Sequence, residues 1–306
     1  MIVIVCPGQG SQKPGFLAPW LDSDENKALL ADYSDAAGLD LAAHGTTSDA
    51  ETIKDTAIAQ PLIVAAGLLA LRALDKHGAL DRVGGIAGHS VGEITAAAGA
   101  GILDVGDAMD FVSQRAVAMA EAANSTPTGM SAVLGGEPDE VIAAAESLGL
   151  QPANYNGGGQ IVVAGDLHAL ARLADEPPAK ARVMPLKVAG AFHTRYMEPA
   201  REFLAAAASL FTASDPKLRI WTNSDGTVVS DGERFRDLLV KQVASPVRWD
   251  LCMQSFAENG VTGLIELAPA GALIGLARRG LKGVPTVAVN TPDDIPAALQ
   301  MIDAAA

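Results

Sequence analysis

The sequence predicts an α/β protein in which a core with a parallel sheet is interrupted by a small α+β insertion. The first six residues are apolar and mostly β-branched, which is typical of a strand buried on both faces. Strand-length apolar runs alternate with helical patterns on both sides of residues 125–189, a segment with its own order of elements. Hydrophobic residues make up 49% of the 306 and charged residues 19%, so the chain can bury a sizeable core.

Before the insertion, the strand at 1–6 ends in a loop, residues 7–12, where glycine permits close backbone approach. Asp104 is placed to cap a helix that runs to about Ala123. The other elements expected here are a helix at 56–75 with almost no polar face, a strand at 83–88 and a helix of small residues at 91–103.

Within the insertion the elements follow the order βαββαβ, which is the split ferredoxin-like pattern. The strands are expected at 130–134, 151–155, 160–164 and 182–188, and the helices at 138–148 and 167–175. We therefore expect one domain made of residues 1–124 and 190–306, and an inserted subdomain at 125–189.

After the insertion the α/β pattern resumes. A helix at 246–259 is expected to begin with Ser245 as N-cap and Pro246 at its first position. The remaining elements are helices at 195–210, 234–243 and 272–281 and strands at 218–222, 262–267 and 285–289.

Composition argues against several classes of protein. A net charge of −14 is unfavourable for binding nucleic acid, which requires an excess of Lys and Arg. Two cysteines give neither a disulfide framework nor a metal-ligand spacing. The apolar start lacks a charged leader, and the apolar run 61–71 is shorter than the roughly 18 residues of a membrane span. We therefore expect a cytoplasmic protein with no metal, no cofactor and no membrane contact.

Ser90 is the first candidate for chemistry. It is the centre of Gly88-His89-Ser90-Val91-Gly92, which is the only Gly-x-Ser-x-Gly in the chain and lies where a strand gives way to a helix. In that context the motif is a nucleophile elbow, with the hydroxyl exposed at the head of a helix. Helix N-termini favour the negative charge that develops in acyl transfer.

Arg115 is the second candidate, because it falls on the apolar stripe of the helix that follows Asp104. A buried guanidinium keeps its charge and must find a carboxylate. That carboxylate is either an Asp or Glu of the protein or a substrate group held in a bidentate fork.

His193 is the candidate base, because a serine nucleophile needs one and the loop 190–194 lies between a strand and a helix. His89 is next to Ser90 and is expected to point away from it, in a structural role. The chain has 36 Asp and Glu, and their spacing selects none of them as a third member of a triad.

These pieces together resemble the malonyl-CoA:acyl carrier protein transacylases of bacterial type II fatty-acid synthesis. The matching motifs occur in the family's order over nearly the whole chain. They are Pro-Gly-Gln-Gly-Ser-Gln at 7–12, Asp-Thr-Ala-Ile-Ala-Gln-Pro at 55–61, Gly-His-Ser-Val-Gly-Glu at 88–93, Arg115, Thr-Gly-Met-Ser-Ala-Val-Leu-Gly at 128–135, Ala-Asn-Tyr-Asn at 153–156, Gly-Ala-Phe-His-Thr at 190–194, Gln242 and Pro-Val-Arg-Trp at 246–249. Gly-Gly-Gly-Gln at 157–160 departs from the more usual Ser-Pro-Gly-Gln.

The resemblance implies a role for each matching position. Ser90 would be the nucleophile, His193 its base, and Gln242 the residue that orients His193. The backbone N–H groups of Gln9 and Val91 would form the oxyanion hole. Substrate would be bound by Arg115, which holds the malonyl carboxylate, and by Phe192, Met119 and Asn154. The implied fold is an α/β-hydrolase-like core with a ferredoxin-like insertion.

The implied partners are malonyl-CoA and holo acyl carrier protein, which is acidic in this family and could dock near Arg278, Arg279 and Lys282. Three other functions stay open: an acyltransferase of polyketide synthesis, a serine hydrolase, and a catalytically dead module that binds carrier protein. In α/β-hydrolases the histidine comes last, near the C-terminus, whereas no histidine follows His193.

Overall fold

A computed structural model describes residues 1–305 of the chain. The larger of its two sheets has six strands in the order β10-β9-β1-β2-β7-β8, of which the first five are parallel and β8 is antiparallel to β7. The strands are β1 (Ile2–Cys6), β2 (Gly85–Gly88), β7 (Ile220–Trp221), β8 (Val228–Val229), β9 (Gly263–Glu266) and β10 (Thr286–Ala288). This is the parallel sheet that the sequence predicts.

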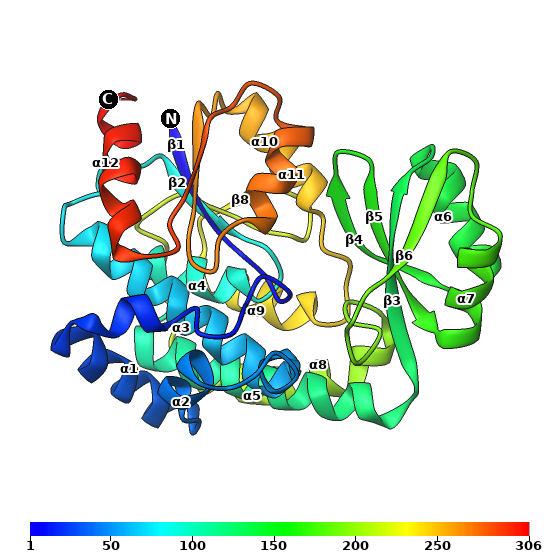
Figure 1. The fold of residues 1–306 in the computed structure, drawn as a ribbon, viewed down its shortest axis with the longest axis horizontal. Coiled ribbons are helices and arrows are strands. Elements are labelled where there is room, and N and C mark those ends of the chain that lie inside the picture. The colour runs from blue at the N-terminus through cyan, green and yellow to red at the C-terminus, as the bar shows by residue number, and fades with distance from the viewer. Residues whose placement is uncertain (306) are drawn as a thin grey trace.

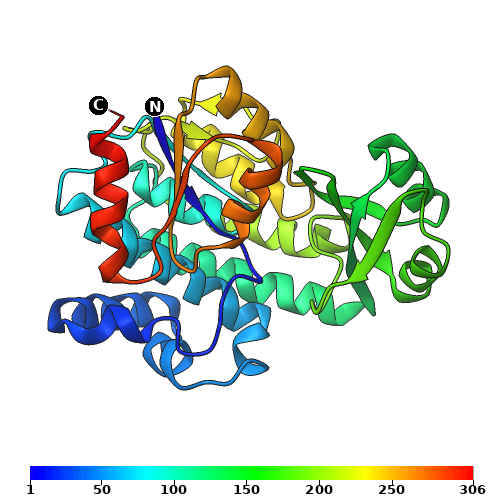
Figure 2. The same cartoon turned by 45° about the horizontal axis from the view of Figure 1, so that its top comes forward.

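Both faces of this sheet are covered by helices. Successive side chains of a strand point to opposite faces, so β1 contributes to the core on each side. Ile4 and Cys6 of β1 belong to the large core on the side of α3, α4 and α5, while Val3 and Val5 pack in a second core with α10 and α11. Figures 1 and 2 show the helices on the two sides of the sheet, with both chain termini near each other. The helices of this part are α1 (Asp24–Ala37), α2 (Leu41–Thr46), α3 (Thr56–Asp75), α4 (Gly92–Gly99), α5 (Val105–Ser125), α8 (Glu198–Ala208), α9 (Gly232–Gln242), α10 (Trp249–Glu258), α11 (Ala272–Gly280) and α12 (Ile295–Asp303).

The second sheet has four antiparallel strands in the order β4-β5-β3-β6. It lies to one side of the core and follows directly from the end of α5 (Figure 1). Its own apolar core is separate from the two cores of the large sheet. The elements are β3 (Thr128–Gly135), α6 (Pro138–Ser147), β4 (Gln151–Gly157), β5 (Gln160–Asp166), α7 (Leu167–Asp175) and β6 (Ala181–Pro185).

The expected N-cap at Ser245 is wrong. Helix α10 begins at Trp249, with Arg248 at its N-cap position, and Val247 forms an isolated bridge with Asn154 instead of helix. The reason is tertiary pairing, because the N–H of Val247 donates to the carbonyl of Ala153 and the N–H of Tyr155 donates to the carbonyl of Val247. This pairing joins the core to β4. By contrast, the predicted cap Asp104 accepts a hydrogen bond from the N–H of Asp107, as expected.

Helix α3 has the bounds that the sequence predicts, and its apolar character extends beyond the run 61–71. By length and composition it could cross a membrane, with a mean hydropathy of 1.8 over its most apolar window. However, 78% of that window is buried inside the protein.

Candidate active site

Ser90 lies in a tight turn between β2 and α4, with a left-handed φ of 53°. The flanking glycines allow this turn to pack closely. A Cβ on Gly88 would lie 2.0 Å from the carbonyl carbon of Gly92, and a Cβ on Gly92 would lie 2.1 Å from the carbonyl oxygen of Cys6. Gly92 is therefore required for the close packing of the turn against the end of β1, and Gly88 for the close approach of β2 to the start of α4.

The hydroxyl of Ser90 and the ring of His193 are joined by a hydrogen bond of 2.7 Å between Oγ and Nε2. The other ring nitrogen, Nδ1, lies 2.8 Å from the backbone carbonyl of Gln242. Since a carbonyl only accepts, Nδ1 carries the proton and Nε2 is free to accept the proton of Ser90. Gln242 thus holds His193 through its main chain.

The imidazole of His193 is neutral at physiological pH. Burial, with a further contribution from the positive charge of Arg115, lowers the pKa of His193 to about 3. Because the uncharged ring accepts a proton, this is the form that a general base requires.

The guanidinium of Arg115 is buried, with 1% of the residue exposed. It donates to Oε1 of Gln60 at 2.5 Å and to Oε1 of Gln242 at 2.8 Å, and it lies 3.4 Å from Oγ of Ser90. Within residues 1–305 it has no Asp or Glu oxygen within 4.0 Å. Burial lowers the pKa of Arg115 to about 10, so its charge persists at neutral pH without a protein carboxylate beside it.

A pocket of about 100 Å³ opens above Ser90. Most of the residues expected at the site line it. They are Gln9, Ser90, Val91, Met119, Asn154, Phe192 and His193. The two others, Arg115 and Gln242, lie behind this lining and contact it at Ser90.

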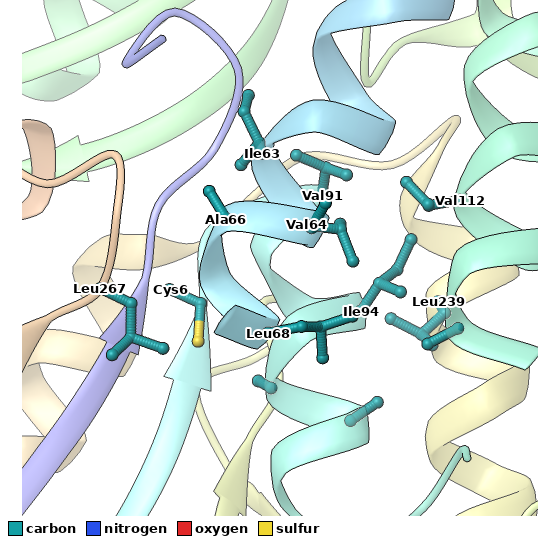
Figure 3. Close-up of a cluster of buried hydrophobic side chains, with 14 of the residues drawn as sticks. Cys6, Ile63, Val64, Ala66, Leu68, Val91, Ile94, Val112, Leu239 and Leu267 are labelled. Carbon is teal, nitrogen blue, oxygen red and sulfur yellow. The ribbon is translucent and has the colours of Figure 1, made fainter. Parts of the chain in front are cut away.

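The backbone N–H groups of Gln9 and Val91 are available at the pocket, because neither donates to a protein acceptor within the described residues 1–305. The side chain of Val91 is fixed in the core with Ile63 and Ile94, as Figure 3 shows. This anchoring holds the N–H of Val91 at the N-terminus of α4, where the partial positive charge of the helix would stabilise an oxyanion.

His89 has the structural environment that the sequence indicated. Its Nε2 lies 2.9 Å from Oδ1 of Asn156, and its ring meets Trp249 edge to face at 5.7 Å between centroids. Its Nε2 therefore bonds to the small sheet rather than to Ser90.

Three residues around Ser90 were not identified from the sequence: Gln60, Glu93 and Asn223. Asn223 accepts the N–H of Ser90 at 2.8 Å and donates to the carbonyl of Gly88 at 2.7 Å. Gln60 and Glu93 are part of the motifs at 55–61 and 88–93, but the motifs alone give them no role. Burial raises the pKa of Glu93 to about 8, against a hydrogen bond from Asn223 and the charge of Arg115.

Among residues 1–305 no group of three or more His, Cys, Asp or Glu is arranged to hold a metal ion. The groups that meet at the pocket are a serine hydroxyl, a neutral imidazole, available amide N–H groups and a buried cation. Groups of these kinds are the ones that acyl transfer requires.

Comparison with known proteins also indicates an acyltransferase. Residues 3–295 match the model of the acyl transferase domain. The malonyl CoA-acyl carrier protein transacylase of Mycobacterium tuberculosis H37Rv is 50% identical over 298 residues, which cover 96% of this chain and 98% of the relative. The chain therefore belongs to the acyl transferase family and, within it, to the malonyl CoA-acyl carrier protein transacylases.

Solved structures support the same assignment. The crystal structure of MCAT from Mycobacterium tuberculosis has a TM-score of 0.94 at 50% identity, covering 97% of this chain and 99% of that one. A malonyl-transacylase in complex with its type II PKS acyl-carrier protein has a TM-score of 0.91 at 30% identity, covering 98% and 99%.

Proposed function

We propose that the protein moves a malonyl group from malonyl-CoA to the phosphopantetheine thiol of an acyl carrier protein, through an ester on Ser90. The hydrogen bond between Ser90 and the neutral ring of His193 is the observation that carries this proposal. The relatives named above act on the same donor and acceptor, and they match this chain over nearly its full length.

In the first half-reaction, Nε2 of His193 accepts the proton of Ser90, and Oγ attacks the thioester carbonyl of malonyl-CoA. The tetrahedral intermediate collapses, the C–S bond breaks, and coenzyme A leaves with the proton from His193. In the second half, His193 accepts the proton of the phosphopantetheine thiol, and the sulfur attacks the ester. Oγ of Ser90 then leaves and regains the proton.

Both tetrahedral intermediates carry a negative oxygen that needs donors. The N–H groups of Gln9 and Val91 would be these donors, which is supported by the position of both residues in the pocket lining. Loss of one donor from such a hole typically raises the barrier by about 3 kcal/mol.

Arg115 selects acyl groups that end in a carboxylate. Its buried charge lacks a protein carboxylate partner, and its Nη2 lies 3.4 Å from the attacking oxygen. A malonyl carboxylate would supply the missing charge in a bidentate pair. Met119, Asn154 and Phe192 line the space that the rest of the acyl group would fill.

The architecture fits the fold that this chemistry commonly uses. Residues 1–124 and 190–306 would form an α/β-hydrolase-like core, which is supported by the parallel sheet and by the serine turn at the end of β2. Residues 125–189 would form a ferredoxin-like insertion, which the antiparallel order β4-β5-β3-β6 supports.

The acidic carrier protein would dock near Arg278, Arg279 and Lys282, at the end of α11. All three are exposed, and none forms an ion pair within residues 1–305. The turn at Gly158 packs against this place, since a Cβ there would lie 2.7 Å from Cβ of Arg279. That turn follows Asn156, the partner of His89 at the pocket, so the patch would lie close to the site.

Transfer to a polyketide carrier protein is the second candidate, because one of the matching structures holds such a carrier. The chemistry is the same in either pathway. We place the reaction in the cytoplasm, where both substrates of such a transfer would be found.

Intact-mass spectrometry after brief exposure to malonyl-CoA tests the proposal, with Ser90→Ala as control. A malonyl adduct on the wild type alone, discharged by holo acyl carrier protein, is the expected result. Release of coenzyme A without an adduct would indicate a hydrolase. No adduct and no release would overturn the malonyl assignment.

A further inference from the structure

Glu93 is a buried carboxyl group that the steps above do not use. It lies in the first turn of α4, three residues after Ser90, and is 1% exposed. No Lys or Arg nitrogen lies within 4.0 Å of it among residues 1–305. Burial of such a group opposes folding unless hydrogen bonds compensate, so its partners matter.

The partners of Glu93 are all donors. Oε1 accepts the backbone N–H of Asn223 at 2.6 Å, and Oε2 accepts a hydrogen bond from the side-chain amide of Gln242. These donors favour the ionised carboxylate against the burial that raises its pKa.

Glu93 thereby fixes which way the amide of Gln242 points. An amide has one donating end and one accepting end. Glu93 accepts from the NH₂ end, together with the carbonyl of Ser90 at 3.1 Å and Oδ1 of Asn223 at 3.3 Å. Oε1 of Gln242 therefore faces Arg115 and accepts its hydrogen bond at 2.8 Å. A flipped amide would set its NH₂ against the guanidinium. Gln242 also holds His193 through its backbone carbonyl, so anchoring Gln242 steadies the base as well.

Glu93 is also linked to Ser90, through Asn223. The backbone N–H of Asn223 is bound by Glu93, while its side chain bonds the N–H of Ser90 and the carbonyl of Gly88. Asn223 thus bonds the strained turn at two points, Gly88 and Ser90, and its own backbone N–H is held by Glu93.

We propose that Glu93 is a positioning residue, which acts through Gln242 and Asn223 to hold Arg115, His193 and Ser90 in the arrangement for transfer of a carboxylate-bearing acyl group. This inference rests on the proposed function, since it assigns a role at the same site. The sequence selected no acidic residue as a partner of His193. Glu93 is an acidic residue that is linked to His193 indirectly, because both contact Gln242.

The test compares Glu93→Gln with Glu266→Gln. Glu266 is also fully buried and accepts two backbone N–H groups, from Leu273 and Ile274 at 2.9 Å each, but it caps α11 and contacts none of the site residues. Both substitutions put an amide where a carboxyl accepts two donors. The rates of malonyl and acetyl loading onto Ser90 are measured by quenched intact-mass spectrometry, together with the thermal midpoint.

Glu93→Gln is expected to slow malonyl loading about tenfold or more, and to narrow the preference for malonyl over acetyl by about tenfold. Glu266→Gln is expected to lower the thermal midpoint and leave that preference unchanged. A double-mutant cycle with Gln242→Ala should be strongly non-additive, because Glu93 acts through Gln242.

An unchanged preference in Glu93→Gln, or additive effects in the cycle, would overturn the positioning role. If Glu93→Gln does not fold, Glu93→Asp takes its place. Asp keeps the carboxyl group but is too short to reach both Asn223 and Gln242, so the same loss of preference is expected. A wild type that forms no malonyl adduct would instead overturn the proposed function, so the two failures are distinguishable.

Discussion

Oγ of Ser90 lies 2.7 Å from Nε2 of His193, and both residues have left-handed backbone conformations, with φ of 53° and 62°. Among the described residues, only Lys180 is a further non-glycine residue with positive φ. Such conformations are unfavourable by about 1–2 kcal/mol for each non-glycine residue. Backbone strain therefore coincides with the hydrogen bond on which the proposed chemistry depends.

The strain at Ser90 predicts that Ser90→Gly is more stable than Ser90→Ala by about 0.5–1 kcal/mol, because glycine adopts positive φ freely but loses more entropy on folding. Urea unfolding of the two variants measures the difference. Both lack the nucleophile, so neither should form an acyl adduct. If Ser90→Ala is instead the more stable variant by about 0.5–1 kcal/mol, only the entropic cost of glycine is left and the turn carries no strain.

The packing of Gly92 predicts that Gly92→Ala is destabilised by several kcal/mol, because the new Cβ would lie 2.1 Å from a backbone oxygen that cannot move far. Gly275→Ala is the matched control. It lies in α11, where a Cβ meets nothing within 4 Å, and it should gain about 0.5–1 kcal/mol from helix propensity. Equilibrium unfolding compares them, and similar stabilities would contradict the prediction.

Local signals in the sequence were enough for the elements with long regular patterns. Helix α3 was predicted with its observed bounds, because apolar residues occupy nearly all sides of the helix. Helices α1 and α2 were missed. Helix α1 buries only Leu30, Tyr33 and Ala37, although Ser23 caps it and Gly38 ends it with φ of 61°. At Ser245 a good local cap signal was overridden by pairing of Val247 with β4, which no local pattern reveals.

The residues of the pocket could be predicted where chemistry demands a particular side chain, as at Ser90 and Arg115. Glu93 and Asn223 could not be ranked in this way. They matter because of a hydrogen bond between them, which joins two residues that are 130 positions apart in the chain. Spacing carries no information on such contacts.

Arg115→Ala should remove the preference for malonyl-CoA. Without the guanidinium the malonyl carboxylate enters a buried pocket with no charge partner, so malonyl loading should fall about 10²-fold or more, while acetyl loading falls much less. Loading rates from the two thioesters check this. If the ratio of the two rates stays as in the wild type, Arg115 does not bind the carboxylate.

Charge reversal at the proposed docking patch, Arg278→Glu with Arg279→Glu, should raise KM for carrier protein several-fold and leave KM for malonyl-CoA unchanged. The effect should shrink at high salt, because exposed charges are screened. Lys27→Glu on α1, away from the small sheet (Figure 1), is the matched control and should change neither constant. Equal rises in both constants would count against docking there.

The low pKa of His193 predicts a loss of stability in acid. The folded ring stays neutral down to about pH 3, whereas the unfolded ring has a pKa of about 6.5. Between these values only the unfolded state binds the proton, so the free energy of unfolding falls as the pH drops from about 6.5 toward 3. Above pH 6.5 the contribution is fully present. His193→Asn, which tolerates positive φ, lacks this titration. Urea unfolding from pH 7 to pH 4 should show the wild type losing more stability than the variant, and parallel losses would mean that the folded ring takes up the proton normally.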